Sequence, residues 1–271
     1  MPEWTIKLLE RIAAAGISEG DMRLLYSSSV GDPIVDYNLF MEQTVGVSNV
    51  YPVFPLGTSF PLGSRYADTI NGFAITQINQ LCCDLLDTLD EGDIPGAIVE
   101  FGVAAGGWLK HILNHLDQKS VFRDIYGFDS FEGLPEPDKQ YDGDAWQKGQ
   151  YANPFEAVQK TLGLSERKHL HLLKGWFSDS FKTQEAQNVK EIAFAKVDCD
   201  LYGPAVECLN FLTGRLSDGA ILMFDDWTHL ATLGETKAFM EWVPCVPQYR
   251  FEFIGFINWR MFFKIRLQSK S

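Results

Sequence analysis

The chain has 271 residues, a formal net charge of −13 and a sequence pI near 4.8. This length suits one sizeable α/β domain with insertions, and the acidic balance argues against a nucleic acid or an anionic membrane as partner. Five cysteines without paired spacings argue against a zinc or disulfide framework, so we expect reduced thiols in a cytoplasmic protein.

Residues 1–65 are expected to form an N-terminal arm or lid. One amphipathic helix precedes irregular sequence, in which YPVFPLGTSFPLGSRY at 51–66 contains three prolines and several aromatic residues. The first residues, MPEWTIKLLERIAAAG, have acids among the apolar residues and lack the pattern of a signal peptide. No apolar run approaches the ~20 residues of a membrane span, so no membrane partner is expected.

Residues 66–271 predict one α/β domain that opens with a helix over 66–90. Five candidate strands follow: AIVEFG (97–102), IYGFDS (125–130), HLHLLKG (169–175), IAFAKVD (192–198) and AILMFDD (220–226). Their alternation with helical segments is typical of a mostly parallel sheet with helices on both faces. The last apolar segment, RFEFIGFINWRMFFKIR at 250–266, predicts a hairpin that places an antiparallel strand on the edge of the sheet.

The segment between the second and third strands contains an unusually long polar stretch. Residues 132–153, EGLPEPDKQYDGDAWQKGQYAN, exceed an ordinary connection between a strand and a helix. Loops of this length in compact domains are often lids or binding loops. We therefore expect residues 132–153 to cover the functional site.

The first strand runs into a glycine-rich turn, VEFGVAAGGW. Gly102, Gly106 and Gly107 permit a tight turn, and the following helix offers free N–H groups to a carboxylate or phosphate. A glycine-rich turn without a ligand is the alternative, because the spacing is not that of dinucleotide folds. Glu100 lies within the apolar strand, and a buried carboxylate needs partners such as a bound ammonium group or backbone donors.

Two further strand ends suggest a nucleoside. Asp129 ends the second strand, where an acid can accept hydrogen bonds from ribose hydroxyls; its alternative role is that of a helix-cap or turn residue. Gly175, Trp176 and Phe177 follow the third strand and would flank an adenine ring or pack in the core. The glycine turn and Asp129 together imply a cofactor that contains adenosine.

Acidic residues end two neighbouring strands. Asp198 closes one, and Asp225 with Asp226 closes the next. Carboxylates packed closely disfavour ionisation unless a cation offsets them, and oxygen ligands suit Mg²⁺ ahead of Ca²⁺ or Mn²⁺. Asp200 would lie just beyond the direct metal ligands or act as a general base beside the metal, since Gly203-Pro204 begins a helix almost at once. Helix capping is the alternative for one acid of the Asp225-Asp226 pair.

Histidines carry less information. The pairs His111/His115 and His169/His171 lack a third ligand, and only His229 follows the acidic residues closely enough to be placed near the site. There is no nucleophile elbow around a serine or cysteine, and there is no P-loop. Covalent hydrolase chemistry is therefore not expected.

The ordered motifs VEFGVAAGG, GFDSFEGLPEPD, GWFSDSF, KVDCDLY and MFDDW resemble the macrocin O-methyltransferase family over roughly residues 65–240. The resemblance implies a Rossmann-like methyltransferase fold with a seven-stranded sheet whose seventh strand is antiparallel. It also implies S-adenosylmethionine and Mg²⁺ as cofactors. The acceptor would be a hydroxyl of a small molecule, expected to be a sugar of a glycosylated natural product, and homo-oligomers would be expected.

Site roles follow from the resemblance residue by residue. Glu100 and its turn (Gly102, Val103, Gly106) would hold the methionine end of the cofactor. Asp129 and Ser130 would bind the ribose, while Gly175, Trp176 and Phe177 would lie at the adenine. Asp198, Asp225 and Asp226 would bind Mg²⁺, with Asp198 also beside the cofactor, and Asp200 would be the base.

The chain departs from the family pattern near the acceptor pocket. Cys199 stands between the paired acids where the family usually has glycine, and Gly203-Pro204 begins the next helix. These differences concern the acceptor more than the reaction. Three alternatives remain: a catechol-type methyltransferase, a metal-dependent glycosyltransferase that uses the DCD motif, and a non-catalytic cofactor-binding protein.

Overall fold

A computed structural model describes residues 50–52, 67–227, 232–257 and 260–268. Most of the predicted N-terminal arm, residues 1–65, lies outside the described residues, as does His229. All five cysteines lie within them, and none forms a disulfide there. No described helix combines the length and apolar character needed to cross a bilayer.

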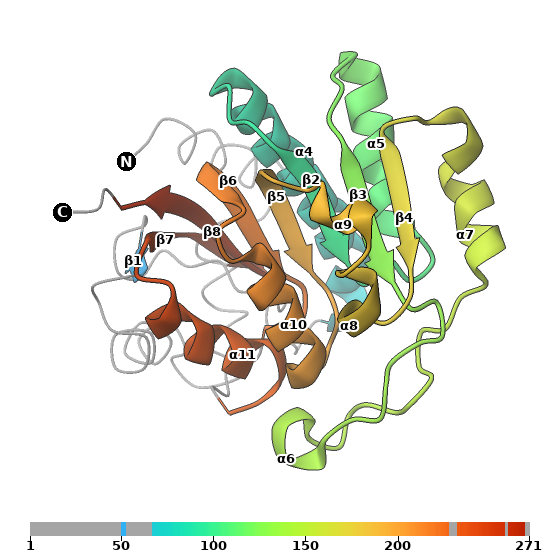
Figure 1. Cartoon of the computed structure of the whole chain (residues 1–271), viewed down its shortest axis with the longest axis vertical. Coiled ribbons are helices and arrows are strands. Elements are labelled where there is room, and N and C mark those ends of the chain that lie inside the picture. The colour runs from blue at the N-terminus through green and yellow to red at the C-terminus, as the bar shows by residue number, and fades with distance from the viewer. Residues whose placement is uncertain (1–49, 53–66, 228–231, 258–259, 269–271) are drawn as a thin grey trace.

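The centre of the fold is a mixed sheet (Figure 1). Its strands are β1 (Val50–Pro52), β2 (Ala97–Phe101), β3 (Ile125–Asp129), β4 (Leu170–Lys174), β5 (Ile192–Val197), β6 (Leu216–Phe224), β7 (Tyr249–Ile257) and β8 (Arg260–Leu267). Their order in the sheet is β1-β7-β8-β6-β5-β2-β3-β4. The predicted seven-stranded sheet is confirmed in β2 to β8, and the short β1 adds an eighth strand beside β7.

The hairpin predicted over residues 250–266 is present, but the prediction that its antiparallel strand lies on the edge was wrong. β8 pairs antiparallel with both β6 and β7, and so occupies an interior position. Consecutive residues of β8, Met261, Phe262 and Phe263, are all fully buried. A strand buried on both faces belongs inside a sheet, where both faces are covered.

Helices cover both faces of the sheet. They are α4 (Ala67–Glu91), α5 (Gly107–Lys119), α6 (Lys139–Asp142), α7 (Phe155–Leu162), α8 (Phe177–Ser180), α9 (Gln184–Gln187), α10 (Tyr202–Leu212) and α11 (Gly234–Trp242), with 3-10 turns at Leu164–Glu166 and Val243–Cys245. In Figure 1, α4 and α5 lie on one face, while α10 and α11 lie on the other. β2 and β5 are buried at every position, as expected of central parallel strands.

The long loop predicted over 132–153 is tied down at its base and at its middle. The backbones of Leu134 and Gln150 are joined by a hydrogen bond of 2.9 Å, and Gly149 N donates to the Leu134 carbonyl at 2.9 Å. In the middle, the Asp142 carboxylate of α6 accepts a hydrogen bond of 2.7 Å from the backbone N–H of Tyr202, at the start of α10. The loop is therefore anchored to the helical layer that contains α10.

Candidate functional site

A cavity of about 340 Å³ opens beyond the carboxyl ends of the central strands. This is the edge at which open α/β sheets bind ligands. Its walls include Gly102, Asp129, Ser130, Trp176, Phe177, Asp198, Asp200, Asp225 and Asp226, together with Ala104, Gly133, Leu134, Pro135, Gln150, Tyr151, Cys199, Pro204 and Arg260. Glu100, Val103, Gly106 and Gly175 were also predicted as site residues but are not among the lining residues.

The glycine turn has a structural reason as well as a place at the cavity. Gly102 has a φ of +90°, and a β-carbon there would lie 1.7 Å from the Asp198 carbonyl oxygen. Only glycine allows β2 to approach the end of β5 this closely. Gly106 also has a positive φ and is the N-cap of the 13-residue helix α5, while Val103 is buried in the core.

Asp129 has the turn role considered from the sequence, and its ribose-binding role stays a prediction. Its carboxylate accepts hydrogen bonds from the backbone N–H groups of Ala104 at 2.8 Å and Phe131 at 2.6 Å. It thereby connects the glycine turn after β2 to the turn after β3, while lining the cavity. The adjacent Ser130 hydroxyl accepts a hydrogen bond of 3.0 Å from Glu132 N and also lines the cavity.

The two predicted aromatic residues differ in position. Trp176 is 38% exposed and lines the cavity, so its ring is available to a ligand. Phe177 also reaches the cavity but stacks on Phe181 at 5.2 Å between ring centroids and packs edge-on against Phe101. Gly175 donates its N–H to the Asp129 carbonyl at 2.9 Å, which fixes the two strand ends relative to each other.

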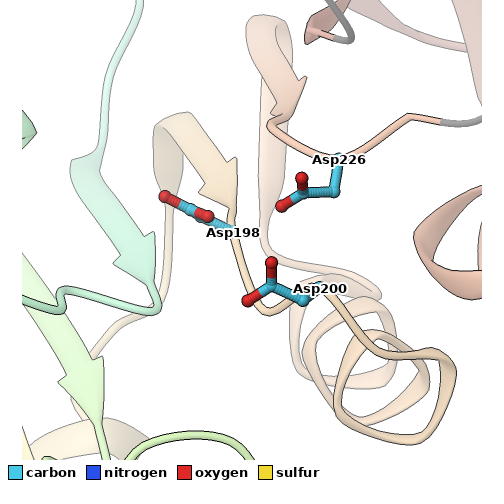
Figure 2. Close-up of side chains that lie close together, drawn as sticks. All are labelled: Asp198, Asp200 and Asp226. Atoms are coloured by element: carbon cyan, nitrogen blue, oxygen red, sulfur yellow. The ribbon is translucent and has the colours of Figure 1, made fainter. Parts of the chain in front are cut away.

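Three aspartates converge at the strand ends. Oxygen atoms of Asp198, Asp200 and Asp226 all lie within 4.8 Å of one another, and Figure 2 shows the Asp200 and Asp226 carboxylates directed toward the side of Asp198. Asp198 follows β5, Asp200 lies at the turn into α10, and Asp226 follows β6. A donor set of carboxylate oxygens suits a hard divalent cation such as Mg²⁺.

Asp225, predicted as a metal ligand, is not brought into this three-aspartate group. Its carboxylate accepts a hydrogen bond of 2.6 Å from Arg260, and Lys196 Nζ lies 3.5 Å away. Burial alone would raise the pKa of Asp225, but the charges of Lys196 and Arg260 hold it below its ordinary value. The structure thus pairs Asp225 with cations and brings Asp200 together with Asp198 and Asp226.

The three-aspartate group disfavours its own ionisation. Burial and the neighbouring Asp225 raise the pKa of Asp198 to about 6, and burial with Asp198 raises that of Asp200 to about 8. Burial, together with Asp200 and Asp198, raises the pKa of Asp226 well above its ordinary value. A bound cation would reverse this balance, because it favours the ionised carboxylates.

Glu100 finds a partner inside the protein. It is 1% exposed, and its Oε1 accepts a hydrogen bond of 3.1 Å from Lys196, whereas its Oε2 has no hydrogen-bond partner. Burial raises the pKa of Glu100 to about 8, although the charge of Lys196 opposes the shift. The predicted contact of Glu100 with the cofactor stays a prediction.

Lys196 is a central residue that sequence reasoning missed. Its ammonium group is buried among the carboxylates of Glu100, Asp198 and Asp225, and it also lies 5.4 Å from the centre of the Trp108 ring. Alternation along β5 places positions 196 and 198 on one face of the strand. The spacing Lys-x-Asp at the end of a buried strand was the available signal.

Two other residues at the site also escaped the sequence analysis. Tyr151 lines the cavity, is 54% exposed and has a φ of +64°, which is uncommon for a residue with a side chain. Glu235, near the start of α11, is fully buried and accepts hydrogen bonds from the backbone of the acidic turns.

The described histidines lie away from the cavity. His115 contacts Asp87 at 2.8 Å, and His171 contacts Glu185 at 2.7 Å while its ring stacks on Tyr126. None of the four histidines in the described part of the chain lines the cavity. The prediction for His229 falls outside that part.

Comparison with known proteins is consistent with this geometry. Residues 65–241 match the family described as Macrocin-O-methyltransferase (TylF). The 8-demethyl-8-(2,3-dimethoxy-alpha-L-rhamnosyl)-tetracenomycin-C 4'-O-methyltransferase of Streptomyces olivaceus is 30% identical over 187 residues, which are 64% of this chain and 66% of that protein. The Mycinamicin III 3''-O-methyltransferase of Micromonospora griseorubida is 27% identical over 147 residues, or 49% and 56%. The chain thus matches just under two thirds of the first relative's length and just over half of the second's.

Solved structures share the fold. The O-methyltransferase NovP superposes with a TM-score of 0.57 at 20% identity, over 70% of this chain and 79% of that chain. CalS11, a calicheamicin methyltransferase, superposes with a TM-score of 0.59 at 21% identity, over 90% of this chain and 96% of that chain. These similarities establish the Rossmann-like methyltransferase fold.

Proposed function

The chain belongs to the macrocin O-methyltransferase family, and from this premise we propose that it methylates a sugar hydroxyl of a natural product with S-adenosylmethionine as donor. One observation carries the proposal. The three-aspartate group faces the same cavity as the glycine turn and Asp129, so a base and a nucleoside site share one space. The name of the Streptomyces olivaceus relative gives a rhamnosyl-bearing tetracenomycin as its substrate, which supports this acceptor class.

The cavity residues fit S-adenosylmethionine. The turn at Gly102 leaves backbone exposed to the cavity, and Asp129 with Ser130 supplies acceptors for ribose hydroxyls. The exposed face of Trp176 offers a surface for the adenine ring. When bound, the cofactor supplies an electrophilic methyl group on a positively charged sulfur.

The three-aspartate group fits a divalent cation. We assign Asp198 and Asp226 as ligands of Mg²⁺, because their oxygen atoms converge and because burial, together with neighbouring carboxylates, raises their pKa values, which a cation would offset. Asp225 was the third predicted ligand, but its pairing with Arg260 favours an indirect role. A bound Mg²⁺ would supply Lewis acidity at this position.

Asp200 is the proposed general base. It lies within the three-aspartate group and lines the cavity, where a cation bound by Asp198 and Asp226 would keep its carboxylate ionised and able to accept a proton. Asp200 takes the hydroxyl proton while the acceptor oxygen gains the methyl group, and S-adenosylhomocysteine is released. The carboxylates also orient the acceptor hydroxyl for in-line transfer.

The loop 132–153 is proposed as a lid. Leu134, Gln150 and Tyr151 come from its two ends and line the cavity. Exclusion of water favours methyl transfer, because the positive charge on sulfur is dispersed in the transition state. Homo-oligomer formation and a cytoplasmic location also remain predictions. Light scattering after gel filtration would test the oligomeric state.

Calorimetry of S-adenosylmethionine and S-adenosylhomocysteine binding, with and without Mg²⁺, tests the proposal. We expect micromolar binding of both ligands, followed by Mg²⁺-dependent methylation of hydroxylated natural-product glycosides. Failure of both ligands to bind would overturn the methyltransferase proposal. Methylation of catechols but not of glycosides would instead favour the catechol-type alternative.

A further inference from the structure

Glu235 is a buried carboxylate that the proposed mechanism does not use. It lies one residue into α11, is 0% exposed and is 35 residues or more from the β5 turn in sequence. Burial and the neighbouring Asp226 raise its pKa well above the ordinary value. A carboxylate held in such a place needs hydrogen-bond donors.

Its donors are backbone groups of the acidic turns. Glu235 Oε1 accepts hydrogen bonds from the N–H of Cys199 at 2.9 Å and of Asp200 at 3.2 Å. Its Oε2 accepts from the N–H of Asp226 at 3.1 Å. One side chain therefore joins the turn after β5 to the turn after β6, and these two turns supply all three aspartates.

The conformation of Asp200 makes this support necessary. Asp200 has a φ of +62°, a region that residues with side chains rarely adopt. A β-carbon on Gly234 would lie 3.1 Å from the Asp200 carbonyl oxygen, so the start of α11 packs directly against this turn. Glu235 and Gly234 together hold the unusual backbone from one side.

We propose that Glu235 is a positioning residue that sets the spacing between Asp200 and Asp226, and thereby the affinity of the three-aspartate group for a divalent cation. The proposal rests on the proposed function for its metal component. A residue that only filled the core would not need both carboxylate oxygens directed at the backbone of two separate turns.

The test replaces the carboxylate with its amide. Glu235→Gln keeps the shape but offers one acceptor oxygen, and its NH₂ group faces a backbone donor. We expect faster amide hydrogen exchange in peptides that contain residues 199–200 and 226. We also expect Mn²⁺ affinity, measured by the electron paramagnetic resonance of free Mn²⁺, to fall about 10- to 100-fold, as for other groups that orient metal ligands.

Asp90→Asn provides the matched control. Asp90, in the last turn of α4, is paired with Arg123, and neither residue lines the cavity. This variant also exchanges an acid for an amide, here in an ion pair and not at backbone donors, and we expect it to lower thermal stability while leaving Mn²⁺ affinity and exchange at 199–200 and 226 unchanged. A purely structural role of Glu235 would make the two variants behave alike.

Each outcome decides the proposal. A folded Glu235→Gln with wild-type Mn²⁺ affinity and wild-type exchange overturns it. If Glu235→Gln does not fold, Glu235→Asp replaces it. The carboxyl group remains, but the shorter side chain supports only one turn, so exchange rises in one peptide and Mn²⁺ affinity falls. Wild-type values in this variant overturn the proposal. If the wild-type protein binds no Mn²⁺, the metal part of the proposed function fails. The positioning role is then tested by amide hydrogen exchange at residues 199–200 and 226 alone.

Discussion

Lys196 balances the acids beneath the cavity, and its charge is expected to be essential for stability. Its side chain is 5% exposed, and it contacts Glu100 and Asp198, so removal leaves buried acids without their cation. We expect Lys196→Met to lower the free energy of unfolding by about 3–5 kcal/mol. Urea denaturation followed by circular dichroism measures this change.

The double variant Lys196→Met with Glu100→Gln identifies the cause. If unpaired charge is responsible, removing the Glu100 charge should restore part of the lost stability, because two partners replaced together cost less than one. A Lys196→Met variant within about 1 kcal/mol of wild type would contradict a structural role for the ion pairs.

Asp198 is the residue at which cation binding and the buried charge network meet. It belongs to the three-aspartate group and also contacts Lys196. We expect Asp198→Asn to reduce turnover at least roughly 100-fold, while the fold and S-adenosylmethionine binding remain. Turnover and calorimetry measure the two effects, with Glu191→Gln at an exposed position as the control. Unchanged turnover would remove the metal from the mechanism.

For single residues, the sequence predicts the candidate site best where the residues directly follow a strand. Asp198, Asp200 and Asp226 could be predicted to meet because parallel strands present their carboxyl ends at one edge. Asp225 could not be separated from Asp226, since only the fold reveals the cation of Arg260 beside it. Glu235 carries no local signal, because its partners lie on turns that precede it by many residues.

Among the secondary-structure elements, the alternation of apolar and polar residues predicts where strands lie better than it predicts which strands pair in the sheet. The hairpin of β7 and β8 follows from the apolar pattern, and the two strands pair as expected. The same pattern leaves open which strand of the hairpin joins β6. In the structure β8 joins β6, and full burial of Met261, Phe262 and Phe263 fits a strand covered on both faces.

The anchoring of α6 suggests how the proposed lid keeps its shape. Asp142 accepts the N–H of Tyr202 at the start of α10, and the rings of Tyr141 and Tyr202 lie 5.0 Å apart. We expect Asp142→Ala to cost about 1 kcal/mol, the usual effect of losing a helix cap. It should also speed proteolysis within 132–153 and raise KM more than it lowers kcat.

Tyr202→Phe separates loop anchoring from general loss of stability. Its hydroxyl donates to Glu241 on α11, whereas its backbone N–H still reaches Asp142. We expect this variant to keep the wild-type proteolysis pattern of the loop. Equal cleavage of the Asp142→Ala variant and the wild-type protein would argue against anchoring at this point.

For the molecule as a whole, a site that gathers negative charge lowers the stability of the folded chain. The net charge of −13 already disfavours a compact state, and three of the carboxylates lie close enough together to add local repulsion. Sites shaped for binding are commonly less stable than inert replacements. The sequence could indicate the excess of acids, but the repulsion depends on the distances that the fold creates.

Thermal unfolding with and without Mg²⁺ tests whether the grouped carboxylates lower the stability of the folded chain. Mg²⁺ at ~100 times its Kd should stabilise the wild-type protein by about 2.7 kcal/mol, because the ion binds only the folded chain. Asp226→Asn relieves repulsion with Asp200 and Asp198, so without Mg²⁺ it should gain about 1 kcal/mol, or roughly 2–4 °C in Tm. The same variant should lose most of the Mg²⁺-induced rise in Tm. A variant that is less stable than wild type without Mg²⁺, yet gains the full rise, would show that Asp226 is a structural residue and that the cation binds elsewhere.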